Sequence, residues 1–105
     1  MVKYICNAFS LNMLASVPAS VKVEEVTPEQ ARSLAEGAES AVGHADTAAV
    51  MSSVLGMSVP MNRTTVALAA GDSVVVGQYK GPRLEEGTTV LPAGATIQWL
   101  LVTVE

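Results

Sequence analysis

Features of exported and membrane proteins are scarce in this chain of 105 residues. Its single cysteine cannot form an intrachain disulfide, and Cys6 is expected to be a buried thiol because it lies in an apolar run. No stretch reaches the roughly 20 apolar residues of a membrane span, and the first residues do not resemble a signal peptide. We therefore expect a cytoplasmic protein, in the host cytoplasm if it is viral, without a membrane partner.

Positive charge is also scarce. Six Lys and Arg residues stand against ten Asp and Glu residues, which gives a net charge of −4. Proteins whose main partner is a long nucleic acid collect basic residues into a stripe, so this class is not expected. A small phosphate-bearing ligand remains open, because two arginines and a helix N-terminus can hold it.

The common catalytic motifs are missing as well. One histidine and one cysteine are too few for a zinc cluster, and the chain has neither a phosphate-binding loop of the Walker type nor a serine in a nucleophile elbow. We expect no metal and no cofactor.

What the chain does contain is the pattern of one α/β domain over residues 1–105, with a core of Val, Ala, Leu and Met. Thr27, Pro28 and Gln30 form a capping-box pattern that predicts a helix to about Glu36, and a second helix is expected from about 45 to Leu55. Gly71-Asp72 suits a two-residue hairpin turn. Strands are expected at residues 2–9, 21–26, 38–42, 64–70, 73–79 and 95–104. The prediction is a mixed sheet of about five strands with two main helices.

Polar residues occur where these elements end. Asn7, Ser10 and Asn12 follow the first strand, where they could cap a turn or form a hydrogen-bonding cradle for a ligand. His44 precedes the second helix, whose free N–H groups could receive a phosphate. It is either a cap or surface residue, or a general acid.

Arg83 and Glu86 lie in a loop with several glycines. An arginine fork suits the oxygens of a phosphoryl group, and a carboxylate could hold that fork or accept a proton. The alternative is a solvated surface ion pair, which contributes little.

Taken together, these residues resemble a known family. The string Asn-Ala-Phe-Ser-Leu-Asn-Met-Leu at 7–14, the Gly43-His44 element followed by Thr47, Asn62-Arg63, and Arg-Leu-Glu-Glu-Gly at 83–87 are similar to the viral anti-CRISPR ring nucleases and their bacterial relatives.

The resemblance implies a homodimer that binds cyclic tetraadenylate across its two subunits. It also implies cleavage to linear diadenylate, which would switch off type III CRISPR signalling. His44, Arg83 and Glu86 match the catalytic residues, and Asn7, Ser10 and Asn12 match pocket positions. Arg63 and Gln78 are further expected binding residues, although the segment around Gln78 differs in length among relatives.

Two other function classes remain open from the sequence. One is a sponge that captures the messenger without cutting it, and the other is a small structural dimer that binds no nucleotide. The apolar alternation of Ile97, Trp99 and Leu101 suggests that the last strand contributes to a dimer interface.

Overall fold

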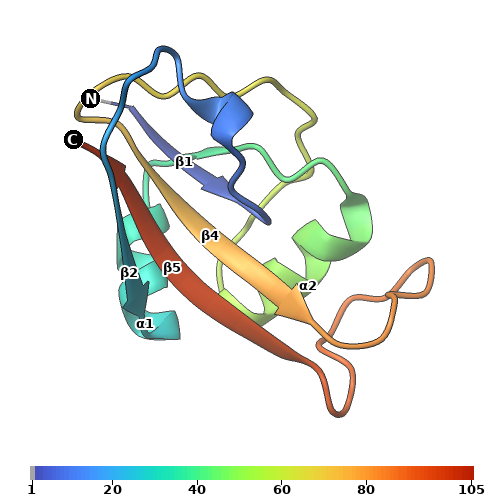
Figure 1. Cartoon of the computed structure of the whole chain (residues 1–105). Coiled ribbons are helices and arrows are strands. Elements are labelled where there is room, and N and C mark those ends of the chain that lie inside the picture. Colours follow the sequence, from blue (N-terminus) through green and yellow to red (C-terminus); the bar gives the residue numbers. More distant parts are fainter. Residues whose placement is uncertain (1) are drawn as a thin grey trace.

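The computed structural model describes residues 2–105, which form a five-stranded mixed sheet with two α-helices on one face (Figure 1). This confirms the predicted fold class. Along the chain the elements are β1 (Lys3–Cys6), the 3-10 turn η1 (Leu11–Met13), β2 (Val21–Val26), α1 (Pro28–Ala35), β3 (Glu39–Ser40), α2 (Ala45–Leu55), β4 (Ser73–Lys80) and β5 (Thr96–Val104).

The sheet has the strand order β2-β5-β4-β1-β3. β1 runs parallel to β3 and β4, whereas β5 runs antiparallel to β4 and β2. The carboxyl ends of β3, β1 and β4 therefore point to the same end of the sheet, which is where open α/β sheets commonly bind ligands. The segments that follow these three strands contain most of the predicted site residues.

One core lies between the sheet and the helices, which stand behind the sheet in Figure 1. Ile5, Val75 and Trp99 of the sheet pack there against Ala31 of α1 and Met51 of α2. Trp99 is only 2% exposed, and Ile97 and Leu101 pack against the same core. Trp99 is thus part of the core of the chain itself, whereas Ile97 and Leu101 are only partly buried, and a contribution of the last strand to a dimer interface stays a prediction.

The other face of the sheet is covered without an α-helix. η1 and the segment 64–70 lie over Cys6, Val76 and Val102, and together they form the second core of the molecule. Cys6 is buried, which confirms the prediction of a buried thiol, and this burial raises the pKa of the thiol to about 11.

Helix α1 begins with the predicted capping box. Thr27 Oγ1 accepts from the backbone N–H of Gln30 at 3.1 Å, and Gln30 Oε1 accepts from that of Thr27 at 2.9 Å. The helix ends at Ala35, and Gly37 turns the chain with a φ of 76°.

The carboxyl end of helix α2 is held by a glycine cap and by α1. Gly56 adopts a left-handed conformation after Leu55, and Arg32 of α1 donates to the carbonyls of Leu55 at 3.0 Å and Gly56 at 2.7 Å. These contacts fix the carboxyl end of α2 against α1. His44 lies at the other end of α2, away from these contacts.

The predicted hairpin around Gly71-Asp72 is wrong. Residues 64–70 do not form a strand of the sheet. They are attached at Leu68, which donates to Met13 O at 2.7 Å and accepts from Ala15 N at 2.9 Å. β4 pairs instead with β1 and β5. Val66 and Leu68 instead pack into the second core of the molecule.

The first and third predicted strands are shorter than expected, at Lys3–Cys6 and Glu39–Ser40. The strand at 21–26 forms, but it is mostly exposed because it is a sheet edge. None of the helices in the described residues is long and apolar enough to cross a membrane.

Candidate functional site

His44 is the N-cap residue of α2. Its carbonyl accepts from the N–H of Ala48 at 3.0 Å, but its imidazole makes no capping hydrogen bond. The side chain is exposed. The imidazole is therefore free to meet a ligand at the helix end where unsatisfied backbone N–H groups favour anions.

A small polar pocket of about 280 Å³ lies at this helix end. It is lined by His44, Asp46, Thr47, Arg83 and Leu84. The structure thus places His44 and Arg83 on the same pocket although they are 39 residues apart in the chain.

Asp46 connects the helix to the long segment 81–95. Its Oδ1 accepts from the backbone N–H of Gly87 at 3.1 Å, and this segment extends past the ends of β4 and β5 in Figure 1. The sequence analysis missed Asp46. An acidic residue in a first helical turn is common, so nothing in the local pattern indicated a partner 41 residues away.

Arg63 also reaches the His44 region. Its Nη2 donates to the carbonyl of Gly43 at 3.4 Å, which places the guanidinium beside the residue preceding His44. The segment before it is fixed to β3, because Ser40 Oγ donates to Pro60 O at 2.6 Å and Asn62 Nδ2 donates to Ser40 O at 2.7 Å.

Asn7, Ser10 and Asn12 follow the carboxyl end of β1, and none of them lines the His44 pocket. Ser10 is the N-cap residue of η1 but makes no side-chain capping bond, and Asn12 is exposed. Their neighbours Phe9 and Met13 pack into the second core, on the face opposite α2. The Ser10 side chain therefore does not cap this turn, which was the alternative to a role in ligand binding.

Glu86 and Gln78 are less closely associated with the pocket. Both are exposed and neither lines it. Gln78 lies opposite Gln98 in the β4–β5 ladder. Within residues 2–105 the only ion pair joins Lys22 and Glu24 at 3.3 Å, so Arg83 and Glu86 do not form the surface pair considered as their alternative.

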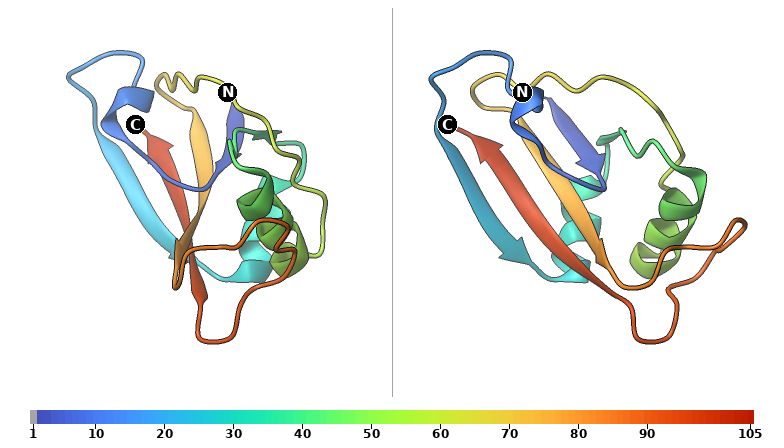
Figure 2. Two further views of the ribbon diagram at one scale, coloured as in Figure 1. Left: turned by 90° about the vertical axis from the view of Figure 1, so that its right-hand side faces the viewer. Right: turned by 45° about the vertical axis from the view of Figure 1, so that its right-hand side comes forward.

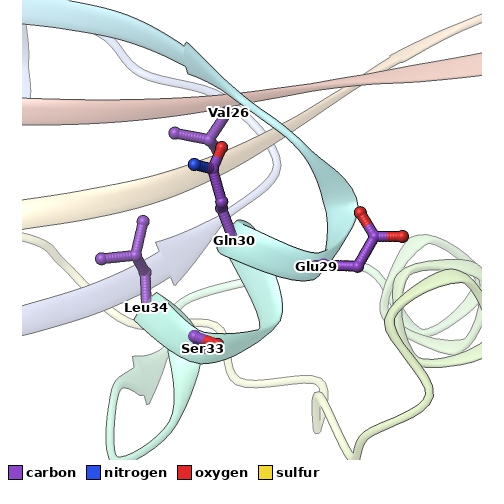
Figure 3. Close-up of a pocket in the computed structure, with 5 residues that line it drawn as sticks. All are labelled: Val26, Glu29, Gln30, Ser33 and Leu34. Atoms are coloured by element: carbon purple, nitrogen blue, oxygen red, sulfur yellow. The ribbon is translucent and has the colours of Figure 1, made fainter.

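A larger groove of about 430 Å³ lies beside α1, and Figure 3 shows the residues around it. Its lining contains no cation and no imidazole, so the smaller His44 pocket is the better candidate for phosphate chemistry. The groove is lined by Val26, Glu29, Gln30, Ser33 and Leu34.

Across residues 2–105, no three side chains of His, Cys, Asp or Glu lie close enough to hold a metal ion together. The groups of the pocket with chemistry suited to an anion are the guanidinium of Arg83, the imidazole of His44 and the N–H groups of the first turn of α2.

Comparison with known proteins gives consistent matches to proteins of archaeal viruses. The family model described as STIV B116-like matches residues 3–93. "Uncharacterized protein 26" of Sulfolobus islandicus filamentous virus (isolate Iceland/Hveragerdi) is 34% identical over 89 residues, which cover 83% of this chain and 75% of that protein. "Uncharacterized protein ORF117" of Acidianus two-tailed virus is 36% identical over 73 residues, which cover 66% of this chain and 62% of that protein.

Among solved structures, B116 of Sulfolobus turreted icosahedral virus superimposes with a TM-score of 0.82. The sequence identity is 25%, and the match covers 98% of this chain and 99% of that chain. The whole architecture is thus shared, including the sheet ends at which the pocket lies.

Proposed function

The chain belongs to the STIV B116-like family, and from that premise we propose that it is a metal-independent ring nuclease that cleaves cyclic tetraadenylate. In this proposal a homodimer binds the ring and converts it to linear diadenylate ending in a 2′,3′-cyclic phosphate. The consequence in a cell would be to switch off type III CRISPR signalling.

The observation that carries the proposal is the pocket at the N-terminus of α2. It places His44 and Arg83 around one cavity of about 280 Å³, next to backbone N–H groups that favour a phosphate. Arg63 adds a second guanidinium near Gly43. A proton donor and cations beside an anion site are what a phosphodiester transesterification needs.

The substrate supplies its own nucleophile. The ribose 2′-hydroxyl oxygen forms a bond to the adjacent phosphorus while the bond from phosphorus to the 5′-oxygen breaks. His44 protonates the departing 5′-oxygen, and Arg83 stabilises charge on the non-bridging oxygens. Once the segment 81–95 lies against the bound ring, Glu86 accepts the 2′-hydroxyl proton; in the alternative, Glu86 orients Arg83 and the proton passes to solvent water.

Symmetry supports a homodimer. A ring of four identical nucleotides has a two-fold axis, so a two-fold dimer presents the same His44 to opposite linkages. The ring is also larger than one pocket, and Asn7, Ser10, Asn12 and Gln78 lie outside the pocket. In the proposed dimer these residues contact the parts of the ring that the His44 pocket leaves uncovered.

The test is cleavage of radiolabelled cyclic tetraadenylate in EDTA by wild type and by His44→Ala, with binding of the ring measured for both. We expect wild type to cut in EDTA and His44→Ala to lose roughly a hundredfold in rate while still binding. Glu36→Ala, an exposed change at the end of α1, is the matched control and should cut like wild type.

The same experiment separates the rival functions. Binding without cutting by wild type would identify a sponge, a reading favoured by the position of Glu86 outside the pocket. Binding by neither protein would overturn the nucleotide-related proposal altogether and leave a structural role.

A further inference from the structure

The segment 81–95 leaves the sheet after β4 and returns to it at β5 (Figure 1), and its two ends approach one another closely. The β4–β5 ladder ends with Lys80 opposite Thr96. One residue further on, a Cβ placed on Gly81 would lie 2.6 Å from Ala95 Cβ and 3.0 Å from Ala95 Cα. Glycine at this position lets the two chain ends stay in contact beyond the last ladder pair, and we call this contact the neck of the segment.

Tyr79 lies across the neck. Its hydroxyl donates to the carbonyl of Pro82 at 2.6 Å and lies 3.1 Å from the position that a Cβ on Gly81 would take. Tyr79 is half-buried and lies opposite Ile97 of β5, which packs against the core on the side of the helices. The phenol therefore starts from a packed strand and binds one backbone carbonyl of the segment.

The Pro82 carbonyl belongs to the peptide unit that leads directly to Arg83. Because a peptide bond is planar, the Pro82 oxygen, the Arg83 N–H and the Arg83 Cα lie in one plane. The pyrrolidine ring also fixes the φ angle of Pro82. A hydrogen bond to this oxygen therefore restricts the Cα atom from which the Arg83 side chain extends.

A second set of contacts holds the segment on the far side of Arg83. Gly87 N donates to Asp46 Oδ1 at 3.1 Å. Thr88 closes a turn there, because its N–H and its hydroxyl donate to Glu85 O at 3.1 Å and 2.6 Å. Arg83 thus lies between two points at which the segment is attached.

Arg83 lies where two pockets meet, so the direction of its side chain matters. On one side it borders the polar pocket with His44. In the part of the chain that the structure describes, no carboxylate pairs with its guanidinium, so its backbone is what directs the side chain. The second pocket, of about 300 Å³, is lined by Pro82, Arg83, Glu85, Thr88, Val90 and Pro92.

We propose that Tyr79 is a positioning residue for ring cleavage, whose hydroxyl holds the Pro82–Arg83 peptide so that the Arg83 guanidinium meets the phosphate beside His44. This inference rests on the proposed function, which gives Arg83 its role. Tyr79 lines neither of the two pockets that contain Arg83. It therefore acts on the reaction only through Arg83.

The effect of Tyr79 should fall on the chemical step. A guanidinium held in place stabilises the charge that develops on the phosphorus oxygens, and this interaction is stronger in the transition state than in the bound ring. Loss of the Tyr79 hydroxyl should therefore slow cleavage more than it weakens binding.

The test is Tyr79→Phe, which removes the hydroxyl and keeps the ring of the side chain. Single-turnover cleavage of cyclic tetraadenylate in EDTA should slow by about three- to tenfold. Affinity for the uncut ring, measured with and without Tyr79→Phe in a His44→Ala background, should change by less than about twofold. Tyr4→Phe makes the same change at the other tyrosine of the chain, which packs against the second core, and should cut like wild type.

A double-mutant cycle with Arg83→Ala shows whether Tyr79 acts through Arg83. Arg83→Ala alone should slow cleavage by roughly a hundredfold. Adding Tyr79→Phe to Arg83→Ala should then slow the reaction no further. A general structural role of the hydroxyl would give the same three- to tenfold loss in both backgrounds, and that result would overturn the proposal.

Nuclear magnetic resonance of the protein without the ring separates this inference from the proposed function. The order parameter of the Arg83 N–H should be about 0.85 in wild type and clearly lower in Tyr79→Phe. If wild type does not cut the ring but the order parameter falls in Tyr79→Phe, the proposed function is wrong and Tyr79 still positions Arg83. If wild type cuts and Tyr79→Phe matches it in rate and order parameter, the proposed function stands and the role of Tyr79 is wrong.

Discussion

At the scale of single residues, His44 and Asp46 have different roles at the start of α2. His44 occupies the N-cap position without using its side chain to cap, which leaves the imidazole available for chemistry. Asp46, in the first turn of the helix, accepts from Gly87 N and so anchors the segment that carries Arg83 and Glu86. In the proposed mechanism, His44 acts on the substrate and Asp46 positions the segment 81–95.

Asp46→Ala removes the acceptor of Gly87 N–H and should slow ring cleavage by about three- to tenfold, the loss expected for one hydrogen bond of about 1 kcal/mol. Asp46→Asn keeps an oxygen acceptor and should recover most of the rate. Single-turnover rates at saturating ring measure both variants.

Because Asp46 acts through the loop, ring affinity should change less than the rate of the chemical step. Unfolding temperatures should stay close to that of wild type. If Asp46→Asn is as slow as Asp46→Ala, the carboxylate charge matters rather than the loop anchor, and the positioning role is wrong.

The sequence predicted the pocket in part. The resemblance identified His44 and Arg83 because their strings are distinctive. Asp46 was missed because its function depends on a contact across 41 residues. Glu86 was expected beside Arg83, yet it does not line the pocket, since a spacing of three residues fixes a direction only inside a regular element.

At the scale of elements, the sequence predicted helices well and sheet partners poorly. α1 carries its start signal within four residues, from Thr27 to Gln30, and local signals of this kind can be read directly. β4 was identified as a strand, but its neighbours β1 and β5 come from distant parts of the chain. Gly71-Asp72 matches the sequence pattern of a hairpin turn. Nothing in the neighbouring residues indicates that the Asp72 carboxylate accepts a hydrogen bond from Val2 N instead.

Gly77→Ala tests how closely α2 packs on the sheet. A Cβ at Gly77 would lie 2.6 Å from Trp99 Cζ3 and 2.9 Å from Met51 Cε, so the indole ring and the end of the Met51 side chain must shift. We expect a loss of about 1–3 kcal/mol in the free energy of unfolding, the range for overpacked cores. Urea unfolding measures it.

Gly43→Ala is the matched control for stability. A Cβ there meets Arg63 at 3.7 Å, which is ordinary contact. Its unfolding free energy should stay within about 0.5 kcal/mol of wild type. Equal stability of Gly77→Ala and Gly43→Ala would show that the interface between α2 and β4 is looser than described.

At the scale of the whole molecule, Asp72 connects three separate segments. Its carboxylate accepts from Val2 N at 2.8 Å and Ala69 N at 2.9 Å, and its carbonyl accepts from Val104 N at 3.0 Å. The bonds from Val2 and Ala69 hold the pKa of Asp72 below its usual value. The folded state therefore binds the ionised carboxylate more favourably than the unfolded chain does.

The pH dependence of stability follows from that direction. The contribution of Asp72 is fully present above the unfolded pKa of about 4, and it is lost as the pH falls through the lower folded pKa. Asp72→Asn should be less stable than wild type at pH 7, with a difference that shrinks below pH 4. Urea unfolding at pH 7, 4 and 3 measures it, and a constant difference would contradict the linkage.

The unequal covering of the two faces of the sheet has a consequence for cooperativity. The face with α1 and α2 is covered by hydrogen-bonded helices, whereas η1 and 64–70 cover the other face with few ladder bonds of their own (Figure 2). Segments of that kind open locally at a fraction of the global unfolding free energy. We therefore expect the half with α1, α2 and His44 to open less often than the half with Asn7, Ser10 and Asn12, which amide exchange would measure. A bound ring that contacts both halves would couple their opening, so the two halves would unfold together as one cooperative unit.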